Sequence, residues 1–320
     1  MMSNVFCIGE LLIDMVCIDN KGLKYGQSFE KKPGGAPANV AAAISKLGGN
    51  AYFLGQVGKD FFGDYLIELL KELKVNTDLT SRGGNTTTAF VGIDKNGERN
   101  FTFLRGSDMD YKFSNINTEI INNTDIIHFG SATGLLGGDL KKTYFELLDY
   151  AIKNNIYICF DPNYRDNLIS NEHLEEYIKD CKIFLKNSDF IKVSLEELFL
   201  ITSEKNCELG IRKLHDIGAK VITVTLGEKG TLLSIKGFKK IIKSIKINQV
   251  DSTGAGDAFV GAVLLQLSKI DNKNEISFEK WEEIIEFANK VGAITCTNYG
   301  AITSIPKIEQ INTYMSDNEI

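Results

Sequence analysis

The chain has 320 residues, 43% of them hydrophobic and 24% charged, which is the composition of a soluble globular protein with a sizeable core. Its formal net charge of −6 gives no electrostatic reason to bind nucleic acid or an anionic membrane. No stretch approaches about 18 consecutive apolar residues and the six cysteines are scattered, so we expect no membrane span and a cytoplasmic protein with reduced thiols.

Predicted strands and helices alternate along most of the chain. Short apolar runs predict strands over residues 5–9, 51–58, 125–130, 156–163, 189–194 and 220–227. Helices are predicted over residues 36–47, before Gly48 and Gly49, and over 61–73, and a late apolar helix opens at Asp257. Repeated strand–helix units whose strands are apolar on both faces indicate an α/β protein with a parallel sheet covered by helices.

Two stretches, at about residues 11–32 and 86–104, break this alternation. They are rich in β-branched and aromatic residues and contain turn signals at Asp19-Asn20 and Asn96-Gly97. We expect antiparallel strands that form a small lid, inserted into a single domain over residues 1–320. An apolar face on such a sheet needs cover from substrate, the main domain or another subunit, so a homodimer through the lid is a hypothesis.

The run DSTGAGDAF, residues 251–259, carries the strongest chemical signal. A helix N-terminus leaves backbone N–H groups without partners and carries partial positive charge. Gly254, Ala255 and Gly256 have little or no side chain, so an anion can approach these N–H groups. The carboxylate of Asp257 beside them indicates proton removal next to a phosphate, as phosphoryl transfer requires. Taken alone, the run also fits an ordinary turn and helix cap.

Polar groups directly follow several of the predicted strands. Ligands of an open α/β sheet bind at the carboxyl ends of its strands. One polar group at such an end is ordinary solvation, whereas several sets on one edge indicate a binding site. The candidate groups, in chain order, are Asp14, residues 34–39, Asp161, Asn163, Arg165, Ser194, Glu197, Gly227, Gly230 and Asp257.

Two motifs carry a resemblance to a known family. GGAPANVA, from Gly34, and DSTGAGDAFVG, from Asp251, resemble the two signatures of the ribokinase-type (PfkB) carbohydrate kinases, with TLGEKG between them. The resemblance covers nearly the whole chain and is greatest to fructokinases, through runs such as FTFLRGSDMD, FDPNYR and KVSLEEL. It implies a ribokinase-like three-layer sandwich with a central, mostly parallel sheet and a small β-sheet lid.

The resemblance implies transfer of the γ-phosphoryl group of ATP to a sugar hydroxyl. Asp257 matches the family's catalytic base, and Gly254, Ala255 and Gly256 match its anion hole. Three of the sugar ligands have an alternative interpretation. These are Asn39 in a turn that faces solvent, Arg105 as a solvated strand end, and Arg165 paired with Asp166. The implied sugar-binding residues are Asp14, Gly34, Gly35, Asn39, Phe103, Arg105 and Arg165.

The resemblance also implies an ATP site and metal ions. TLGEKG matches the loop under the ATP phosphates, although it fits a hairpin turn equally well. Glu197 matches a residue linked to Mg²⁺ through water, while Ser194 stands where many members have Asn. The predicted potassium site is formed by Asp251, Thr253 and Ser304, which fit helix-cap roles nearly as well. The implied nucleotide-binding residues are Lys192, Ser194, Glu197, Thr225, Gly227, Gly230, Gly254, Gly256 and Asn289.

Other readings of the chain are weaker or stay open. The chain has no Walker loop, no GxGxxG after a strand and no HRD motif, which disfavours P-loop, dinucleotide-binding and protein kinase assignments. A sensor that binds sugar or nucleotide without turnover remains an alternative, because fold does not fix function. D-Fructose is the expected substrate. The run Gly106 to Asp110 departs from the fructokinase pattern, which keeps 2-keto-3-deoxygluconate, other ketoses and nucleosides open.

Overall fold

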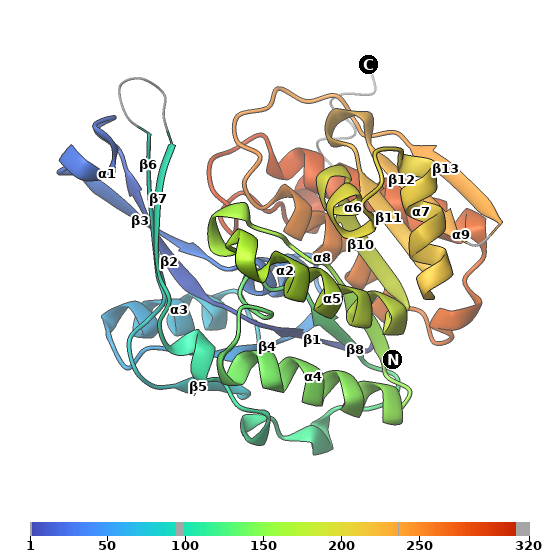
Figure 1. The fold of residues 1–320 in the computed structure, drawn as a ribbon, viewed down its shortest axis with the longest axis horizontal. Coiled ribbons are helices and arrows are strands. Elements are labelled where there is room, and N and C mark those ends of the chain that lie inside the picture. The colour runs from blue at the N-terminus through green and yellow to red at the C-terminus, as the bar shows by residue number, and fades with distance from the viewer. Residues whose placement is uncertain (1, 94–98, 236, 312–320) are drawn as a thin grey trace.

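The computed structural model describes residues 2–93, 99–235 and 237–311, which form a large sheet between two layers of helices and a smaller sheet that projects from them (Figure 1). The large sheet has the order β13-β12-β11-β10-β9-β8-β1-β4-β5. Its pairs are parallel except at β12, which is antiparallel to both of its neighbours. The strands are β1 (Asn4–Ile8), β4 (Asn50–Val57), β5 (Thr80–Arg82), β8 (Ile126–Phe129), β9 (Tyr157–Phe160), β10 (Phe190–Ser194), β11 (Val221–Thr225), β12 (Thr231–Ile235) and β13 (Phe238–Ile242).

Two hydrophobic clusters fill the space between the sheet and its helices. Alternate residues of β1 enter different clusters, Val5 and Cys7 on one face and Phe6 and Ile8 on the other. The first cluster includes side chains of α2 (Ala36–Lys46), α3 (Phe61–Glu72), α8 (Ala255–Ser268) and α9 (Phe278–Thr295). The second includes side chains of α4 (Gly138–Lys153), α5 (Asn171–Asn187), α6 (Leu195–Thr202) and α7 (Cys207–Ile217). The predicted three-layer sandwich is therefore confirmed.

The small sheet, which we call the lid, has the order β3-β2-β6-β7. Its strands are β2 (Leu12–Cys17), β3 (Phe29–Gly34), β6 (Thr88–Ile93) and β7 (Arg99–Leu104), and the short helix α1 (Gly22–Tyr25) lies between β2 and β3. The pairs β2–β3 and β6–β7 are antiparallel as expected, but β2 and β6 are parallel. The predicted turn at Asn96-Gly97 lies outside the described residues.

The predicted strands and helices match the observed ones closely, with one shift that concerns the site. Helix α8 begins at Ala255 behind an N-cap at Gly254, so Asp257 is the third residue of the helix and not its first. Helix α2 ends at Lys46 with Leu47 as its C-cap, and the next residue, Gly48, has a φ of 91°, which suits glycine. None of the helices formed by the described residues combines the length and hydropathy that a bilayer crossing needs.

Candidate active site

The predicted catalytic aspartate contacts a predicted sugar ligand from the other end of the chain. Asn39 in the first turn of α2 donates a hydrogen bond from Nδ2 to Oδ2 of Asp257 at 2.7 Å. Burial raises the pKa of Asp257 to about 6, although this hydrogen bond and the positive charge of Arg165 both lower it. A carboxyl group with this pKa is a better proton acceptor near neutral pH than an ordinary aspartate.

The loop before Asp257 leaves room for an anion at the start of α8. No side chain of the described residues caps this helix, whose N-cap Gly254 has a φ of 77°. An added Cβ on Gly254 would lie 2.8 Å from Cα of Ala301, so only glycine fits there. The N–H of Ala255 donates to the carbonyl oxygen of Ser252 at 3.2 Å, so that donor is engaged locally in this structure.

A buried lysine adds positive charge beside this loop. Lys192 lies on β10 and forms an ion pair with Asp161 at 3.0 Å. Its Nζ is 3.5 Å from the position that a Cβ on Gly256 would take. Burial disfavours the ammonium form of Lys192, but the negative charges of Asp161, Glu197 and Asp257 outweigh burial and raise its pKa. The ammonium group is therefore fixed as a cation next to the predicted anion hole.

The predicted sugar ligand on the lid shares its electrostatic surroundings with Asp257. Burial and the negative charge of Glu10 raise the pKa of Asp14 to about 6, and Arg165 opposes both effects. Oδ2 of Asp14 is only 2.3 Å from the position of a Cβ on Gly34, so the backbone approaches this carboxylate as glycine alone allows. Arg165 is thus the cation that acts on both Asp14 and Asp257.

The three remaining sugar-ligand predictions differ in how firmly their side chains are held. Arg105 is not a free strand end, since its Nε pairs with Asp108 at 3.1 Å and its Nη2 donates to the carbonyl oxygen of Thr133 at 3.1 Å. Phe103 on β7 is half-buried and stacks on Phe101 with ring centroids 6.2 Å apart. Arg165 is exposed, and it forms no ion pair with its chain neighbour Asp166 in the described part of the structure.

The predicted nucleotide residues on β10 and α6 form a helix cap. Ser194 and Glu197 make a capping box, in which Ser194 Oγ accepts from the Glu197 N–H at 3.1 Å and Glu197 Oε2 accepts from the Ser194 N–H at 2.7 Å. The other carboxylate oxygen of Glu197 accepts from the N–H of Tyr164 at 2.8 Å. Each oxygen keeps a lone pair for water, which fits an indirect role toward Mg²⁺.

The predicted phosphate loop is also a hairpin connection. Gly227 and Gly230 have φ values of 60° and 96° in the turn that joins β11 to β12, and Thr225 ends β11. Asn289 on α9 is buried and fully bonded, because its amide accepts from Thr231 Oγ1 at 2.7 Å and donates to the carbonyl oxygen of Ile242 at 2.9 Å. Its side chain therefore links α9 to β12 and to the end of β13.

The predicted potassium residues link two loops behind the anion hole. Oδ1 of Asp251 accepts from the N–H and hydroxyl of Thr253, and its Oδ2 accepts from the N–H of Gly300 at 2.9 Å. Ser304 Oγ donates to the carbonyl oxygen of Tyr299 at 2.8 Å. Among the described residues, no group of three or more His, Cys, Asp or Glu side chains could hold a metal ion. A cation here would therefore depend on carbonyl and hydroxyl oxygens around one carboxylate.

The sequence reasoning missed Glu10, Asp108 and Lys46. Glu10 is 1% exposed and holds the start of α2, and the buried Asp108 anchors Arg105. Nζ of Lys46 donates to the carbonyl oxygens of Ile302 and Ile305 at 2.8 and 2.7 Å. A charged residue directly after a buried strand was the available signal for Glu10, whereas nothing in the local sequence marks the partners of Lys46.

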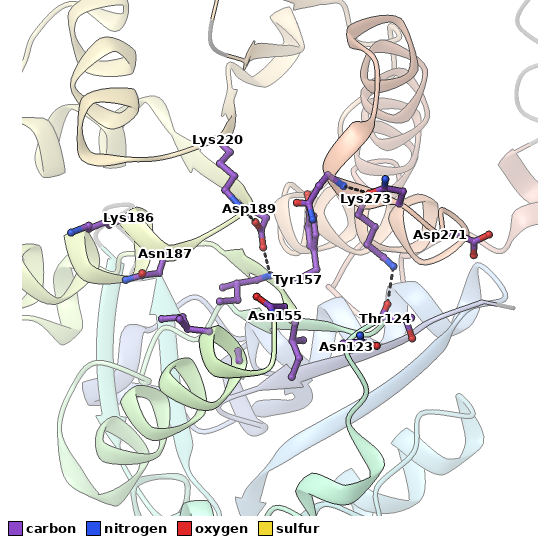
Figure 2. A pocket seen from close by; sticks show the side chains of 16 residues that line it. Asn123, Thr124, Asn155, Tyr157, Lys186, Asn187, Asp189, Lys220, Asp271 and Lys273 are labelled. Atoms are coloured by element: carbon purple, nitrogen blue, oxygen red, sulfur yellow. Dashed lines mark hydrogen bonds and ion pairs between the residues drawn. The ribbon is translucent and has the colours of Figure 1, made fainter.

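A pocket of about 500 Å³ lies at the opposite end of the strands of the large sheet, where β9, β10 and β11 begin (Figure 2). Two of its lysines bind protein atoms. Lys220 pairs with Asp189 at 2.5 Å, and Lys273 donates to the carbonyl oxygen of Thr124 at 2.7 Å. None of the residues brought together around Asp257 lines this pocket.

Comparisons with known proteins agree with this geometry. The model of the pfkB family carbohydrate kinase matches residues 2–308. Fructokinase-2 of Oryza sativa subsp. japonica is 39% identical over 313 residues, covering 95% of this chain and 91% of the relative. A crystal structure of Vibrio cholerae O395 fructokinase with fructose, ADP and calcium has a TM-score of 0.88 at 29% identity, covering 98% and 99% of the two chains. Salmonella enterica aminoimidazole riboside kinase has a TM-score of 0.86 at 27% identity, covering 98% and 100%.

Proposed function

We propose, since the chain belongs to the pfkB family of carbohydrate kinases and is therefore an ATP-dependent sugar kinase, that its substrate is D-fructose and its product fructose 6-phosphate. The relatives that support this choice are fructokinases 34% to 39% identical over more than nine-tenths of the chain. The observation that carries the mechanism is the hydrogen bond between Asn39 and Asp257, which joins the sugar motif to the phosphoryl-transfer motif.

In this mechanism Asp257 is the general base. The 6-hydroxyl oxygen of fructose attacks the γ-phosphorus of ATP, its proton passes to a carboxylate oxygen of Asp257, and ADP leaves with the bridging oxygen. The backbone N–H groups of Gly254, Ala255 and Gly256 receive the charge of the transferred group. For Ala255 this requires exchange of its hydrogen bond to Ser252 for one to phosphate.

The sugar is bound between the lid and the start of α2. Oδ1 of Asn39 is buried and has no partner among the described residues, which leaves it free to accept a sugar hydroxyl. Asp14 accepts further hydroxyls, and the small backbone of Gly34 and Gly35 allows the ring to approach. Arg105 donates from the guanidinium positions that Asp108 and Thr133 leave open, and Phe103 and Arg165 border the same space.

ATP is bound across the strands β10 to β12. Lys192 lies beside Gly256 and suits a terminal phosphate, and the backbone of Gly227 and Gly230 suits the other phosphates and the ribose. Ser194, Thr225 and Asn289 shape the pocket through the cap and strands that they hold. Glu197 would hold Mg²⁺ through water, and the ion would supply neutralisation of the β- and γ-phosphate charge. We also propose that Asp251, Thr253 and Ser304 would hold a K⁺ ion.

A nucleoside is the second candidate substrate. The likeness to aminoimidazole riboside kinase favours it over the other open alternatives. A sensor without turnover is disfavoured, since the base, its hydrogen-bonded partner and the uncapped helix start are all present. We further propose one kinase domain over residues 1–320, a cytoplasmic location, and a homodimer formed through the lid.

Release of ADP from Mg-ATP tests this function across D-fructose, ribose, 2-keto-3-deoxygluconate, tagatose 6-phosphate and adenosine. The proposal predicts the highest kcat/KM for fructose. Preference for another compound of the panel would refute the fructose assignment and leave the kinase assignment intact. Tight sugar binding without ADP release for any compound would instead support the sensor.

A further inference from the structure

Glu10 is a buried carboxylate that joins two loops at the sugar end of the fold. It lies two residues after the end of β1 and is 1% exposed. Its Oε1 accepts from the N–H of Ala36 at 3.1 Å and from the N–H of Ala132 at 3.4 Å. Its Oε2 accepts from the hydroxyl of Ser131 and, at 3.4 Å, from the hydroxyl of Thr133. The two loops that it joins are 26 and more than 120 residues away along the chain.

Both loops hold predicted contacts to the sugar. Ala36 follows Gly34 and Gly35, and a Cβ on Gly35 would lie 2.4 Å from the carbonyl oxygen of Glu10. The carbonyl oxygen of Thr133 accepts from Arg105 at 3.1 Å. Through its two carboxylate oxygens, Glu10 therefore fixes the backbone next to the predicted sugar contacts Gly34 and Gly35. It also fixes the loop whose carbonyl oxygen at Thr133 accepts from Arg105.

Neutral hydrogen-bond donors surround the carboxyl group of Glu10. No lysine or arginine of the described residues forms an ion pair with it, and the negative charge of Asp108 is nearby. Burial raises the pKa of Glu10, while the donors around it lower that pKa. A buried carboxyl group is costly unless it is hydrogen-bonded, and its removal would leave the N–H groups of Ala36 and Ala132 without this acceptor. The four convergent donors therefore fix the position of both loops relative to the end of β1.

We propose that Glu10 is a positioning residue for the sugar subsite, which it holds in shape without touching the substrate. This inference rests on the proposed function, because it takes the Gly34–Gly35 backbone and Arg105 as sugar contacts. Loss of Glu10 frees both at once, so the sugar is bound and oriented less well. The ATP site on β10 to β12 makes no hydrogen bond to Glu10 in the described structure and should keep its affinity.

The test compares Glu10→Ala and Glu10→Gln with Asp125→Ala as a matched control. Asp125 is a buried carboxylate at the opposite end of β1, where it accepts from the N–H groups of Asn4 and Asn122, both at 2.9 Å. We expect Glu10→Ala to raise the KM for fructose by at least about tenfold, since small misplacements of bound substrate are costly. The KM for ATP should change less than about twofold in all three variants.

Glu10→Gln keeps the proposal testable if the alanine variant does not fold. Its amide oxygen still accepts from Ala36, and the hydroxyls of Ser131 and Thr133 can turn to accept from its NH₂ group, so we expect an intermediate KM for fructose. The proposal is overturned if both Glu10 variants keep the wild-type fructose KM, if the ATP KM rises equally, or if Asp125→Ala has the same effect.

Failure of the proposed function gives a different result. If the wild-type protein does not phosphorylate fructose, the fructose assignment is wrong, and the same variants are compared with the compound of the panel that it does phosphorylate. If it phosphorylates none, binding of fructose by isothermal calorimetry replaces KM, with a weaker Kd in Glu10→Ala expected and an unchanged Kd contradicting the positioning role.

Discussion

At the scale of single residues, the account depends on Asp257 as the proton acceptor. Asp257→Asn keeps the shape of the side chain and can still bond to Asn39, but it cannot take the hydroxyl proton. We expect kcat to fall by about 10²- to 10⁴-fold, the usual contribution of a general base, while fructose binding changes little. Steady-state ADP release and calorimetric binding measure the two quantities. A kcat near that of the wild type would remove Asp257 from its role.

The pH dependence follows from the raised pKa of the same residue. Asp257 accepts a proton only in its ionised form, so kcat/KM should be constant above neutral pH and fall as the pH drops through about 6. Asp14 also has a pKa of about 6 and adds to this limb. The profile of Asp14→Asn separates the two, because the limb due to Asp257 should persist. A flat profile down to about pH 5 in that variant would contradict the base assignment.

Gly34 tests the close approach between the GGAPAN loop and the lid. An added methyl group would lie 2.3 Å from Oδ2 of Asp14 and would push that carboxylate away from the sugar. We expect Gly34→Ala to raise the KM for fructose by at least about tenfold. Gly83→Ala is the control, since its methyl group would meet only the flexible side chain of Gln56 at 3.1 Å. Equal kinetics in the two variants would show that Gly34 is not needed for sugar binding.

Residue chemistry in the motifs was predictable, and long-range partners were not. The small residues before Asp257 predict an anion site, and the resemblance of GGAPANVA to the first family signature implies that Asn39 binds a ligand. The partner of that amide could not be predicted, because it lies 218 residues away along the chain. Glu10 was missed for the same reason. Its donors come from two loops that only the fold brings together.

At the scale of elements, apolar runs and glycine stops predicted the strands and helices of the large sheet. The direction of β2 against β6 was not predictable, since alternation of side chains is the same in parallel and antiparallel pairs. The start of α8 was predicted two residues late, because Ala255 and Gly256 are part of the small-residue loop by composition but of the helix by hydrogen bonding.

Variants of the capping box of α6 distinguish a structural role of Ser194 from a role in nucleotide binding. Removal of an N-cap hydroxyl costs about 0.5–2 kcal/mol, so Ser194→Ala should lower the free energy of unfolding by that amount in urea titrations. Ser194→Asp keeps a cap acceptor and should restore stability. Full stability in Ser194→Ala would mean that the capping box is dispensable, whereas a raised KM for ATP in both variants would support the nucleotide role.

At the scale of the whole molecule, the lid presents apolar side chains that the central core does not cover. It carries exposed apolar side chains at Ile93, Phe101 and Leu104. We expect these to be covered in a homodimer, so sedimentation equilibrium at micromolar concentration should give twice the chain mass, and Phe101→Lys should shift the protein toward a monomer. A wild-type monomer under these conditions would contradict the dimer, and the lid would then be covered by substrate or the main domain.

The central claim is that one edge of this sheet brings ATP and the 6-hydroxyl of fructose together at Asp257. Phosphorus NMR of the products formed from Mg-ATP and D-fructose tests it most directly. We expect fructose 6-phosphate and ADP in equal amounts, and neither product in Asp257→Asn on the same timescale. Phosphate on another hydroxyl, ADP without a sugar phosphate, or an equal yield from Asp257→Asn would contradict it.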